Sequence, residues 1–98
     1  MTRDDVLAIL AANRDQFGRF AVRSLAIFGS VARDEATDGS DVDILVEFEE
    51  GRTLGLFEFV RLQRYLGELL GCRVDLATPE ALRKEMREQI LKEAIRAA

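Results

Sequence analysis

The chain contains no histidine among its 98 residues, and this absence excludes several kinds of active site. A Ser-His-Asp triad, a histidine-assisted RNA-cleaving site and a His-ligated zinc site all need that side chain. The single cysteine, Cys72, excludes an internal disulfide, and its place at the start of an apolar run predicts a small buried residue.

Long apolar segments and an excess of positive charge are also absent. The first ten residues include charged side chains and lack the long apolar segment of a signal peptide or a membrane span. We therefore expect a cytoplasmic protein with no membrane contact. The net charge of −4 argues against broad electrostatic binding of nucleic acid. Lysine occurs only at Lys84 and Lys92, so arginine supplies most of the positive charge, and arginine favours bidentate contacts with phosphate or carboxylate.

What the chain does have is the composition of an ordinary globular domain. It is 48% hydrophobic and 33% charged, and its length predicts one domain spanning residues 1–98. That length leaves no room for a second, substrate-binding domain.

Hydrophobic periodicity and turn residues divide the chain into seven elements in the order αβαβαβα. Thr2 and Asp5 form a capping-box pattern, Gly71 is typical of a helix end, and Thr78 with Pro79 is typical of a helix start. Thr53 is a plausible N-cap for the long helix. The expected elements are a helix over 2–20, a strand over 22–28, a short helix over 30–35, a strand over 41–48, a helix over 54–70, a strand over 72–77 and a last helix from 78 onward.

The last helix is predicted to bury one face. The apolar residues of that face are four positions apart, and two further apolar residues lie beside them. That face consists of Leu82, Met86, Ile90 and Ala94, with Leu91 and Ile95 beside it. In the long helix, Leu54, Phe57, Phe59 and Tyr65 are apolar beyond the main stripe, and they either complete the core or form a patch for a partner or a second copy.

The order of elements predicts the fold class. The connection between the first two strands is short, and Gly29 at the end of one must approach Asp41 at the start of the next if both are to meet one ligand. These strands are therefore expected to run antiparallel. The resulting fold is α/β (α+β), with a small mixed sheet of about three strands and helices packed on one face.

The segment from Leu25 to Val46 holds the chemistry. Asp41 and Asp43 stand at i and i+2 in a strand and so point to the same face. Carboxylate oxygens are the ligands that Mg²⁺ prefers, and two metals can clamp the attacking and leaving oxygens of a displacement. Gly29 lets the backbone approach a phosphate closely, and Ser30 offers a hydroxyl and an N–H at a helix start.

Three further residues complete this candidate site. Asp75 is the acidic residue inside the third strand, where an unpaired charge is expensive and a metal would be a partner. Arg33 lies one turn along the short helix and is placed to contact a phosphate oxygen. Ser40 precedes the carboxylate pair and is placed to orient Asp41 or to contact a triphosphate.

Each feature also has an ordinary structural explanation. Asp-x-Asp on a half-exposed strand is usually a solvated face, Gly-Ser after a strand is usually a turn, and Arg33 alone would be a surface residue. A calcium loop starting at Asp34 fails because Ala36 and Leu45 occupy ligand positions, and no Walker A lysine follows a glycine loop. The combination in this order favours a nucleotide site.

The combination resembles the minimal nucleotidyltransferases of the DNA polymerase beta superfamily. Their signature is a hydrophobic residue, Gly and Gly or Ser, about ten residues, and then Asp-h-Asp/Glu-h, where h is hydrophobic. Here it stands as Phe28-Gly29-Ser30 and Asp41-Val42-Asp43-Ile44. The wider pattern GSxxRxxxxxxSDxDxxV is filled as well, by Gly29, Ser30, Arg33, Ser40, Asp41, Asp43 and Val46. The order of elements agrees with a palm-like nucleotidyltransferase fold.

The resemblance implies two Mg²⁺ ions at Asp41, Asp43 and Asp75, and ATP as the donor of AMP with pyrophosphate as the leaving group. Minimal members are commonly encoded beside a helical HEPN ribonuclease toxin and act as its antitoxin. In that family the nucleotidyltransferase adenylylates a tyrosine of the toxin. A homo-oligomer or hetero-oligomer is compatible with this role, and direct nucleic-acid binding is not expected.

Two other functions remain open at this point. A non-catalytic antitoxin would neutralise the toxin by binding alone, with a vestigial site. Transfer of a nucleotide to a small molecule would need an acceptor pocket, which a chain of this length would have to build as an oligomer.

Overall fold

The centre of the fold is a four-stranded sheet in the order β3-β2-β1-β4. The computed structural model describes residues 1–37, 39, 41–51 and 55–98. The strands are β1 (Val22–Phe28), β2 (Val42–Phe48), β3 (Val74–Ala77) and β4 (Ile95–Arg96). β1 is antiparallel to β2 and to β4, whereas β2 and β3 are parallel. The sheet is therefore mixed, as predicted, but β4 adds a strand that the sequence did not predict.

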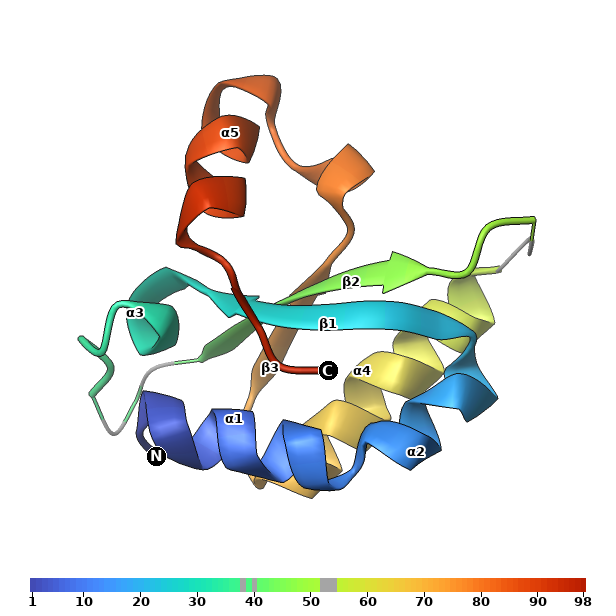
Figure 1. Cartoon of the computed structure of the whole chain (residues 1–98), viewed down its shortest axis with the longest axis horizontal. Helices are drawn as coiled ribbons and strands as arrows, with labels where there is room; N and C mark the ends of the chain where they lie inside the picture. Colours follow the sequence, from blue (N-terminus) through green and yellow to red (C-terminus); the bar gives the residue numbers. More distant parts are fainter. Residues whose placement is uncertain (38, 40, 52–54) are drawn as a thin grey trace.

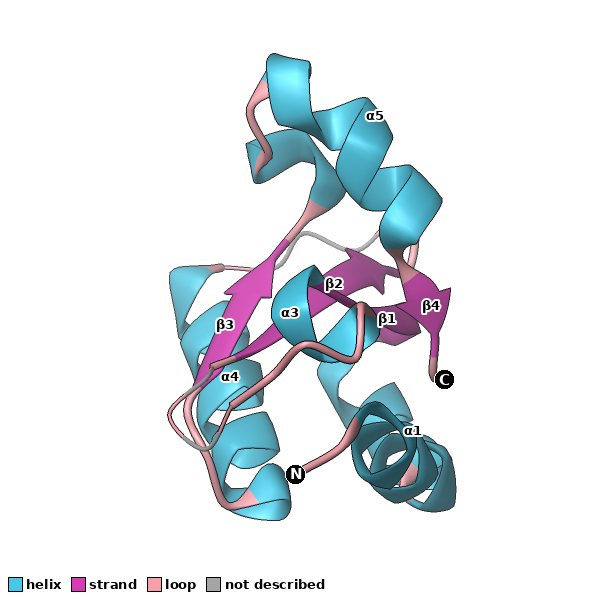
Figure 2. Ribbon diagram, turned by 90° about the vertical axis from the view of Figure 1, so that its left-hand side faces the viewer, coloured by secondary structure: helices cyan, strands magenta, loops and turns pink. Residues whose placement is uncertain are grey.

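The helices lie on both sides of this sheet. α1 (Arg3–Ala12), α2 (Arg14–Phe17) and α4 (Leu56–Leu70) lie on one side, and α5 (Lys84–Glu93) lies on the other (Figure 1; Figure 2). The short α3 (Gly29–Ala32) follows β1 directly. Helices on one face alone were expected, so the position of α5 is a correction.

Alternation along the strands separates the two faces of the sheet. Val42, Ile44 and Val46 of β2 are buried on one face, while Asp43 and Glu47 on the other face are only partly buried and Leu45 between these two is buried. The buried set packs against leucines of α4 and apolar residues of α1 in one continuous core. Its members are Val6, Leu10, Phe17, Leu25, Ile27, Val31, Ala32, Val42, Ile44, Val46, Leu62, Leu66, Leu70, Val74, Leu76 and Ala97.

The first helical region is broken, whereas a single helix over 2–20 was predicted. The capping box at its start is present, with Thr2 and Asp5 bonding each other's backbone N–H. α1 ends at Ala12 with Asn13 as its C-cap, because the Asn13 side chain donates a hydrogen bond to the Ile9 carbonyl and competes with the helical pattern. α2 and the 3₁₀ turn η1 (Gly18–Phe20) continue from there.

α4 matches its prediction except at its start. Gly55 is its N-cap, and the expected first residues Thr53 and Leu54 lie outside the described residues. Gly71 ends the helix in the left-handed conformation with φ of 68°, as a C-cap glycine should. Of the apolar residues beyond the main stripe of this helix, Phe59 and Tyr65 pack on the core, whereas Phe57 is exposed.

The last predicted helix is in fact two elements. A 3₁₀ turn, η2 (Pro79–Ala81), is separated from α5 by extended backbone at Leu82 and Arg83. The Arg87 guanidinium donates hydrogen bonds to the carbonyls of Glu80 and Leu82, and it so satisfies backbone groups at the break.

The apolar face predicted for that helix is wrong in most of its members. Ile90 is buried, but Met86 and Leu91 are exposed. Ile95 lies in β4, because its neighbourhood pairs with β1 at Ala26 and Ile27 instead of continuing the helix.

Two smaller points concern single features. Cys72 is half-buried at the edge of the core, which is less burial than predicted. Within the described part of the chain, no helix combines the length and the apolar character that crossing a membrane would require.

Candidate active site

The register of the central strands brings two of the predicted carboxylates together. β2 and β3 pair in parallel with Asp43 opposite Asp75, and on the other side β1 pairs with β2 so that Phe28 lies opposite Asp43. Gly29 comes directly after Phe28 and therefore lies beside Asp43. Residues distant in sequence thus converge at one end of three neighbouring strands.

Gly29 is required at its position for two reasons. Its φ of +73° lies in the left-handed region, where residues with a Cβ are strained. A Cβ placed on Gly29 would also stand 2.1 Å from Oδ2 of Asp43. The carboxylate therefore rests directly over the glycine backbone, next to Ser30 at the start of α3.

The electrostatic state of Asp43 reflects this crowding. Partial burial raises the pKa of Asp43 above its ordinary value, and the negative charges of Asp75 and Asp41 raise it further. Arg33 opposes this effect by lowering the pKa. Burial and the nearby negative charges therefore destabilise the charged form of Asp43, and a bound cation would stabilise it.

The other predicted residues surround this pair at greater exposure. Asp75 is exposed, and Asp41 is exposed immediately before β2 begins. Asp41 is still close enough to act on the pKa of Asp43. Ser40 lies outside the described residues.

The carboxylates suit Mg²⁺ by their chemistry more than by their present arrangement. Hard oxygen donors are the correct ligand type, and the repulsion between Asp43, Asp75 and Asp41 is what a divalent cation would neutralise. In the described part of the chain, however, no three Asp, Glu, His or Cys side chains are already arranged to hold a metal ion. Mg²⁺ is usually held by one or two carboxylates together with substrate phosphates and water, and Asp43 with a neighbouring carboxylate would supply the protein ligands.

Arg33 is held at the site by two carboxylates. Its Nε lies 3.1 Å from Oε2 of Glu35, and its Nη1 lies 3.3 Å from Oε2 of Glu93 on α5. The hydrogen bond to Glu35, followed by the charges of both carboxylates, raises the pKa of Arg33. The guanidinium is therefore charged and tethered to α5.

α5 forms a wall of the site that the sequence did not reveal. A pocket of about 300 Å³ lies between the end of β1, Asp43 and α5. Its lining is Phe28, Gly29, Arg33, Asp43, Met86, Gln89, Ile90 and Glu93. Met86 is exposed and lines this pocket instead of packing in the core. The only sequence signal was the abundance of polar residues around Ile90, which is not specific.

Comparison with known proteins agrees with this geometry. Residues 8–97 match the family model of the nucleotidyltransferase domain. The chain is also 41% identical over 96 residues to the protein adenylyltransferase MntA of Thermococcus cleftensis, covering 97% of this chain and 95% of that protein. The chain belongs to the nucleotidyltransferase family. It is accordingly an enzyme of nucleotidyl transfer.

Solved structures support the same fold. A minimal nucleotidyltransferase with 43% identity superposes with a TM-score of 0.80, covering 97% of this chain and 95% of that one. A chain from the complex of a tri-AMPylated Shewanella oneidensis HEPN toxin with its MNT antitoxin superposes with a TM-score of 0.59 at 18% identity, covering 91% of this chain and 71% of that chain. At that identity the second match shows the fold alone.

Proposed function

We propose that this nucleotidyltransferase is an antitoxin that transfers AMP from ATP to a tyrosine of a HEPN ribonuclease toxin, with Mg²⁺ as cofactor. The observation that carries the proposal is the pairing of Asp43 with Asp75 beside Gly29, in a chain 41% identical to a protein adenylyltransferase. We also propose that residues 1–98 form one minimal nucleotidyltransferase domain.

The roles of the site residues follow from their positions. Gly29 and Ser30 would contact the triphosphate through backbone and hydroxyl groups, and Arg33, which lines the same pocket as Gly29, would supply positive charge. Ser40 is assigned a minor role beside Asp41, as its place in the motif predicts. Asp41, Asp43 and Asp75 are the residues that would hold Mg²⁺, which supplies charge neutralisation at the phosphates.

Asp75 is the candidate base for the acceptor. It is exposed at the edge strand β3, whereas Asp43 is partly buried between β1 and β3. An incoming tyrosine hydroxyl therefore reaches Asp75 more easily, and Asp75 is placed to accept its proton as the oxygen attacks the α-phosphorus of ATP. The bond to pyrophosphate then breaks, and AMP remains on the tyrosine oxygen.

A protein acceptor suits the shape of this chain. The candidate site lies at one end of the sheet, and α5 borders it on the side opposite α1 and α4 (Figure 2). The structure of the tri-AMPylated toxin with an MNT antitoxin supports a HEPN toxin as the partner. AMP on the toxin would add bulk and negative charge beside a site that must admit an RNA phosphate, and so would block cleavage.

The test is the mass of the partner after incubation with ATP and Mg²⁺. The purified chain would be mixed with a candidate HEPN toxin, and intact mass spectrometry would count AMP units. We expect one or more AMP units with the native chain and with Glu47→Gln, which removes a carboxylate from the same strand outside the site. We expect Asp43→Asn to lose more than the ~10–100-fold that removal of an outer metal partner costs.

Two outcomes would contradict the proposal. An unmodified toxin that is inhibited in a stable complex would show neutralisation by binding alone. AMP addition that persists in Asp43→Asn would show that transfer does not need the Asp43 carboxylate.

A further inference from the structure

One face of α5 lies against the candidate active site. The α5 residues that line the pocket of about 300 Å³ are spaced as i, i+3, i+4 and i+7, and they are Met86, Gln89, Ile90 and Glu93. Residues at this spacing share one side of a helix. The rest of the lining comes from the end of β1, from α3 and its C-cap, and from β2, as Phe28, Gly29, Arg33 and Asp43. α5 therefore faces, across the pocket, the residues assigned to the phosphates and to Mg²⁺.

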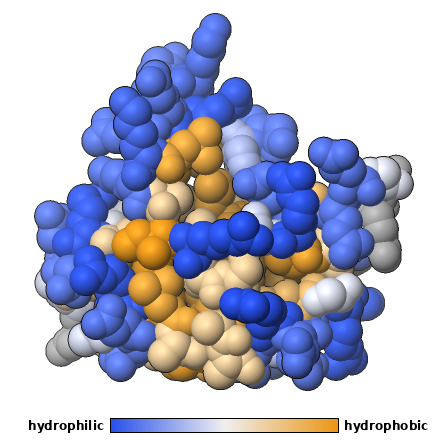
Figure 3. Space-filling view, viewed as in Figure 1, coloured by the Kyte–Doolittle hydropathy of each residue, from blue (hydrophilic) through white to orange (hydrophobic). Residues whose placement is uncertain are grey.

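This face of α5 combines apolar and polar side chains. The helix is mostly charged, and the part of the surface around it is mostly hydrophilic (Figure 3). Its three apolar residues are Met86, Ile90 and Leu91, of which Met86 and Ile90 line the pocket. A thioether makes favourable contacts with aromatic rings, so this part of the wall suits the flat face of a nucleobase.

Glu93 connects Gln89 to the arginine of the motif. Its Oε2 lies 3.3 Å from Nη1 of Arg33, and its Oε1 accepts a hydrogen bond from Nε2 of Gln89 at 3.5 Å. A carboxylate attracts the amide nitrogen of a glutamine and repels its oxygen, so the nitrogen stays on the Glu93 side. No described residue donates a hydrogen bond to the Gln89 oxygen. That oxygen is therefore left as an acceptor in a residue that lines the pocket.

An acceptor of this kind distinguishes the nucleobases. Adenine and cytosine carry an exocyclic amino group, which donates hydrogen bonds, whereas guanine and uracil carry a carbonyl oxygen at the corresponding position. An amide oxygen bonds the amino group and is repelled by the carbonyl. A purine also offers a larger ring face to Met86 and Ile90 than a pyrimidine does. Adenine is the base that matches both features.

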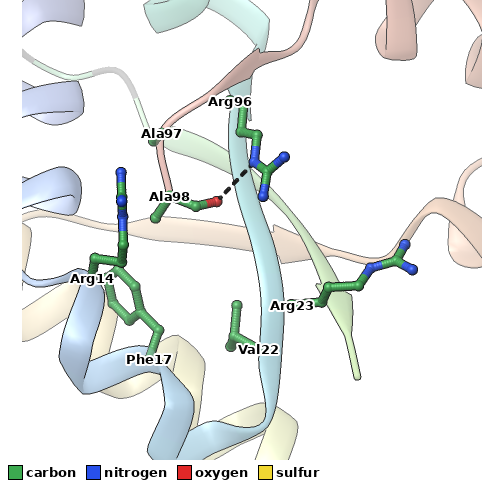
Figure 4. A pocket seen from close by; sticks show the side chains of 7 residues that line it. All are labelled: Arg14, Phe17, Val22, Arg23, Arg96, Ala97 and Ala98. Carbon is green, nitrogen blue, oxygen red and sulfur yellow. Dashed lines mark hydrogen bonds between the residues drawn. The ribbon is translucent and has the colours of Figure 1, made fainter. Parts of the chain in front are cut away.

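A larger cavity, of about 470 Å³ at the start of β1, has no side chain of this type (Figure 4). It is lined by Arg14, Phe17, Val22, Arg23, Arg96, Ala97 and Ala98. Its polar side chains are arginines, which donate hydrogen bonds and cannot accept one from an amino group. Two of them also have partners within the chain, because Arg23 pairs with Glu47 and Arg96 donates to the Ala98 carbonyl. The match to adenine is thus particular to the α5 pocket.

We propose that the pocket face of α5 is the nucleobase subsite and that Gln89 selects adenine. The inference rests on the proposed function, because it takes a nucleoside triphosphate as the ligand of this pocket. With the phosphates beside Gly29 and Arg33, the base packs on Met86 and Ile90. The Gln89 oxygen accepts a hydrogen bond from the adenine amino group, and Glu93 orients the Gln89 amide.

The first test compares ATP with inosine triphosphate by calorimetric titration in the presence of Mg²⁺. Inosine triphosphate is a purine nucleotide in which a carbonyl oxygen replaces the amino group of adenine. The native chain should bind ATP about tenfold more tightly, since the analogue loses one hydrogen bond and sets two oxygens against each other. Gln89→Met keeps the length of the side chain without its amide, so the two affinities should become equal. Gln16→Met makes the same substitution in α2, outside the pocket lining, and should keep the preference for ATP.

The second test locates the base. The chain has two methionines, Met1 and Met86, so ¹³C-methyl methionine labelling gives two NMR signals, which Met86→Leu assigns. ATP should shift the Met86 signal through the ring of its base and leave the Met1 signal in place. Inorganic triphosphate has no ring and should produce a much smaller shift at Met86.

The outcomes separate this inference from the proposed function. Equal affinities of the native chain for the two nucleotides, a preference for ATP that persists in Gln89→Met, or an unmoved Met86 signal would each overturn the inference, even if AMP is transferred to a toxin. A preference that depends on Gln89 without AMP transfer to a HEPN toxin would support the inference and contradict the proposed function. Absence of binding by either nucleotide would contradict both.

Discussion

The two faces of the sheet carry opposite kinds of side chain, although the same strands supply both. Ile44 and Leu76 point into the core under α4, whereas their chain neighbours Asp43 and Asp75 point to the other face. The covered face consists of close-packed apolar residues, whereas the other face holds Asp43, whose pKa is raised by partial burial and by nearby negative charges. Stability and chemistry are thus separated by the alternation of a strand and not by distance along the chain.

The helices on the two sides differ in the same way. α4 buries Leu62, Leu66 and Leu70 against the sheet, whereas α5 buries Ile90 and turns Gln89 and Glu93 toward the pocket. A helix that covers a core needs a full apolar stripe, and a helix that borders a solvent-filled site does not. α5 is therefore best understood as a wall of the site.

A substitution in β2 tests whether the covered face contributes to stability alone. Ile44→Ala removes a fully buried side chain and should lower the free energy of unfolding by about 2–5 kcal/mol, measured by urea denaturation. The folded fraction should keep its rate of AMP transfer. A variant that loses transfer while keeping its stability would show that the covered face takes part in the chemistry.

The second prediction concerns the close contact between Gly29 and Asp43. Gly29→Ala should cost about 1–2 kcal/mol of stability through its left-handed backbone. It should also lower AMP transfer on the order of 10–100-fold, because the new Cβ displaces the carboxylate. Gly51→Ala is the matched control, since Gly51 has a φ of +79° but open space around its Cβ position. Equal transfer by both variants would mean that the position of Asp43 is not critical.

The third prediction uses the raised pKa of Asp43. Because the folded chain holds this proton more tightly than the unfolded chain, the carboxyl contributes stability below its ordinary pKa of 3.8, and that contribution is lost as pH rises through the raised folded value. Asp43→Asn should therefore have a higher Tm than the native chain at pH 7 without metal. The difference should vanish in acid, as thermal unfolding followed by circular dichroism would show. A lower Tm of the variant at pH 7 would mean that the charge is already compensated.

The smallest expected effect concerns Glu93. Glu93→Gln keeps an oxygen that can accept the hydrogen bond from Arg33, but it removes a negative charge from the pocket wall. Nucleotide binding measured by calorimetry should tighten by roughly 0.2–1 kcal/mol, and the gain should shrink at high salt. Glu88→Gln is the control, because Glu88 pairs with Lys92 on the same helix. Weaker binding in Glu93→Gln would mean that the charge of Glu93 is needed to position Arg33.

Much of the fold could be predicted because it depends on local patterns. β1 has the predicted bounds, β2 and β3 begin one or two residues later than expected, and the antiparallel pairing of β1 with β2 followed from their short connection. The family was also predicted, since its motif is local. The catalytic roles of Asp41, Asp43 and Asp75 stay predictions until variants are assayed.

The errors lie where side-chain hydrogen bonds or contacts with other elements override the helical preference of a segment. The break before α5 depends on hydrogen bonds from Arg87 to carbonyls five and seven residues earlier, and β4 forms because β1 offers an edge to Ile95 and Arg96. Neither partner is visible in a periodicity calculation over a single segment. The ion pair between Arg33 and Glu93 joins residues 60 positions apart and was equally hidden.

The sequence by itself determined the nucleotidyltransferase motif, the separation of Asp43 from Ile44 onto opposite faces, and the glycine at the end of β1. These are consequences of spacing along one or two adjacent strands. Only the tertiary structure decided that Asp75 stands opposite Asp43 and that α5 borders the site. These arrangements depend on strand register and on helix placement, which packing of the whole chain selects.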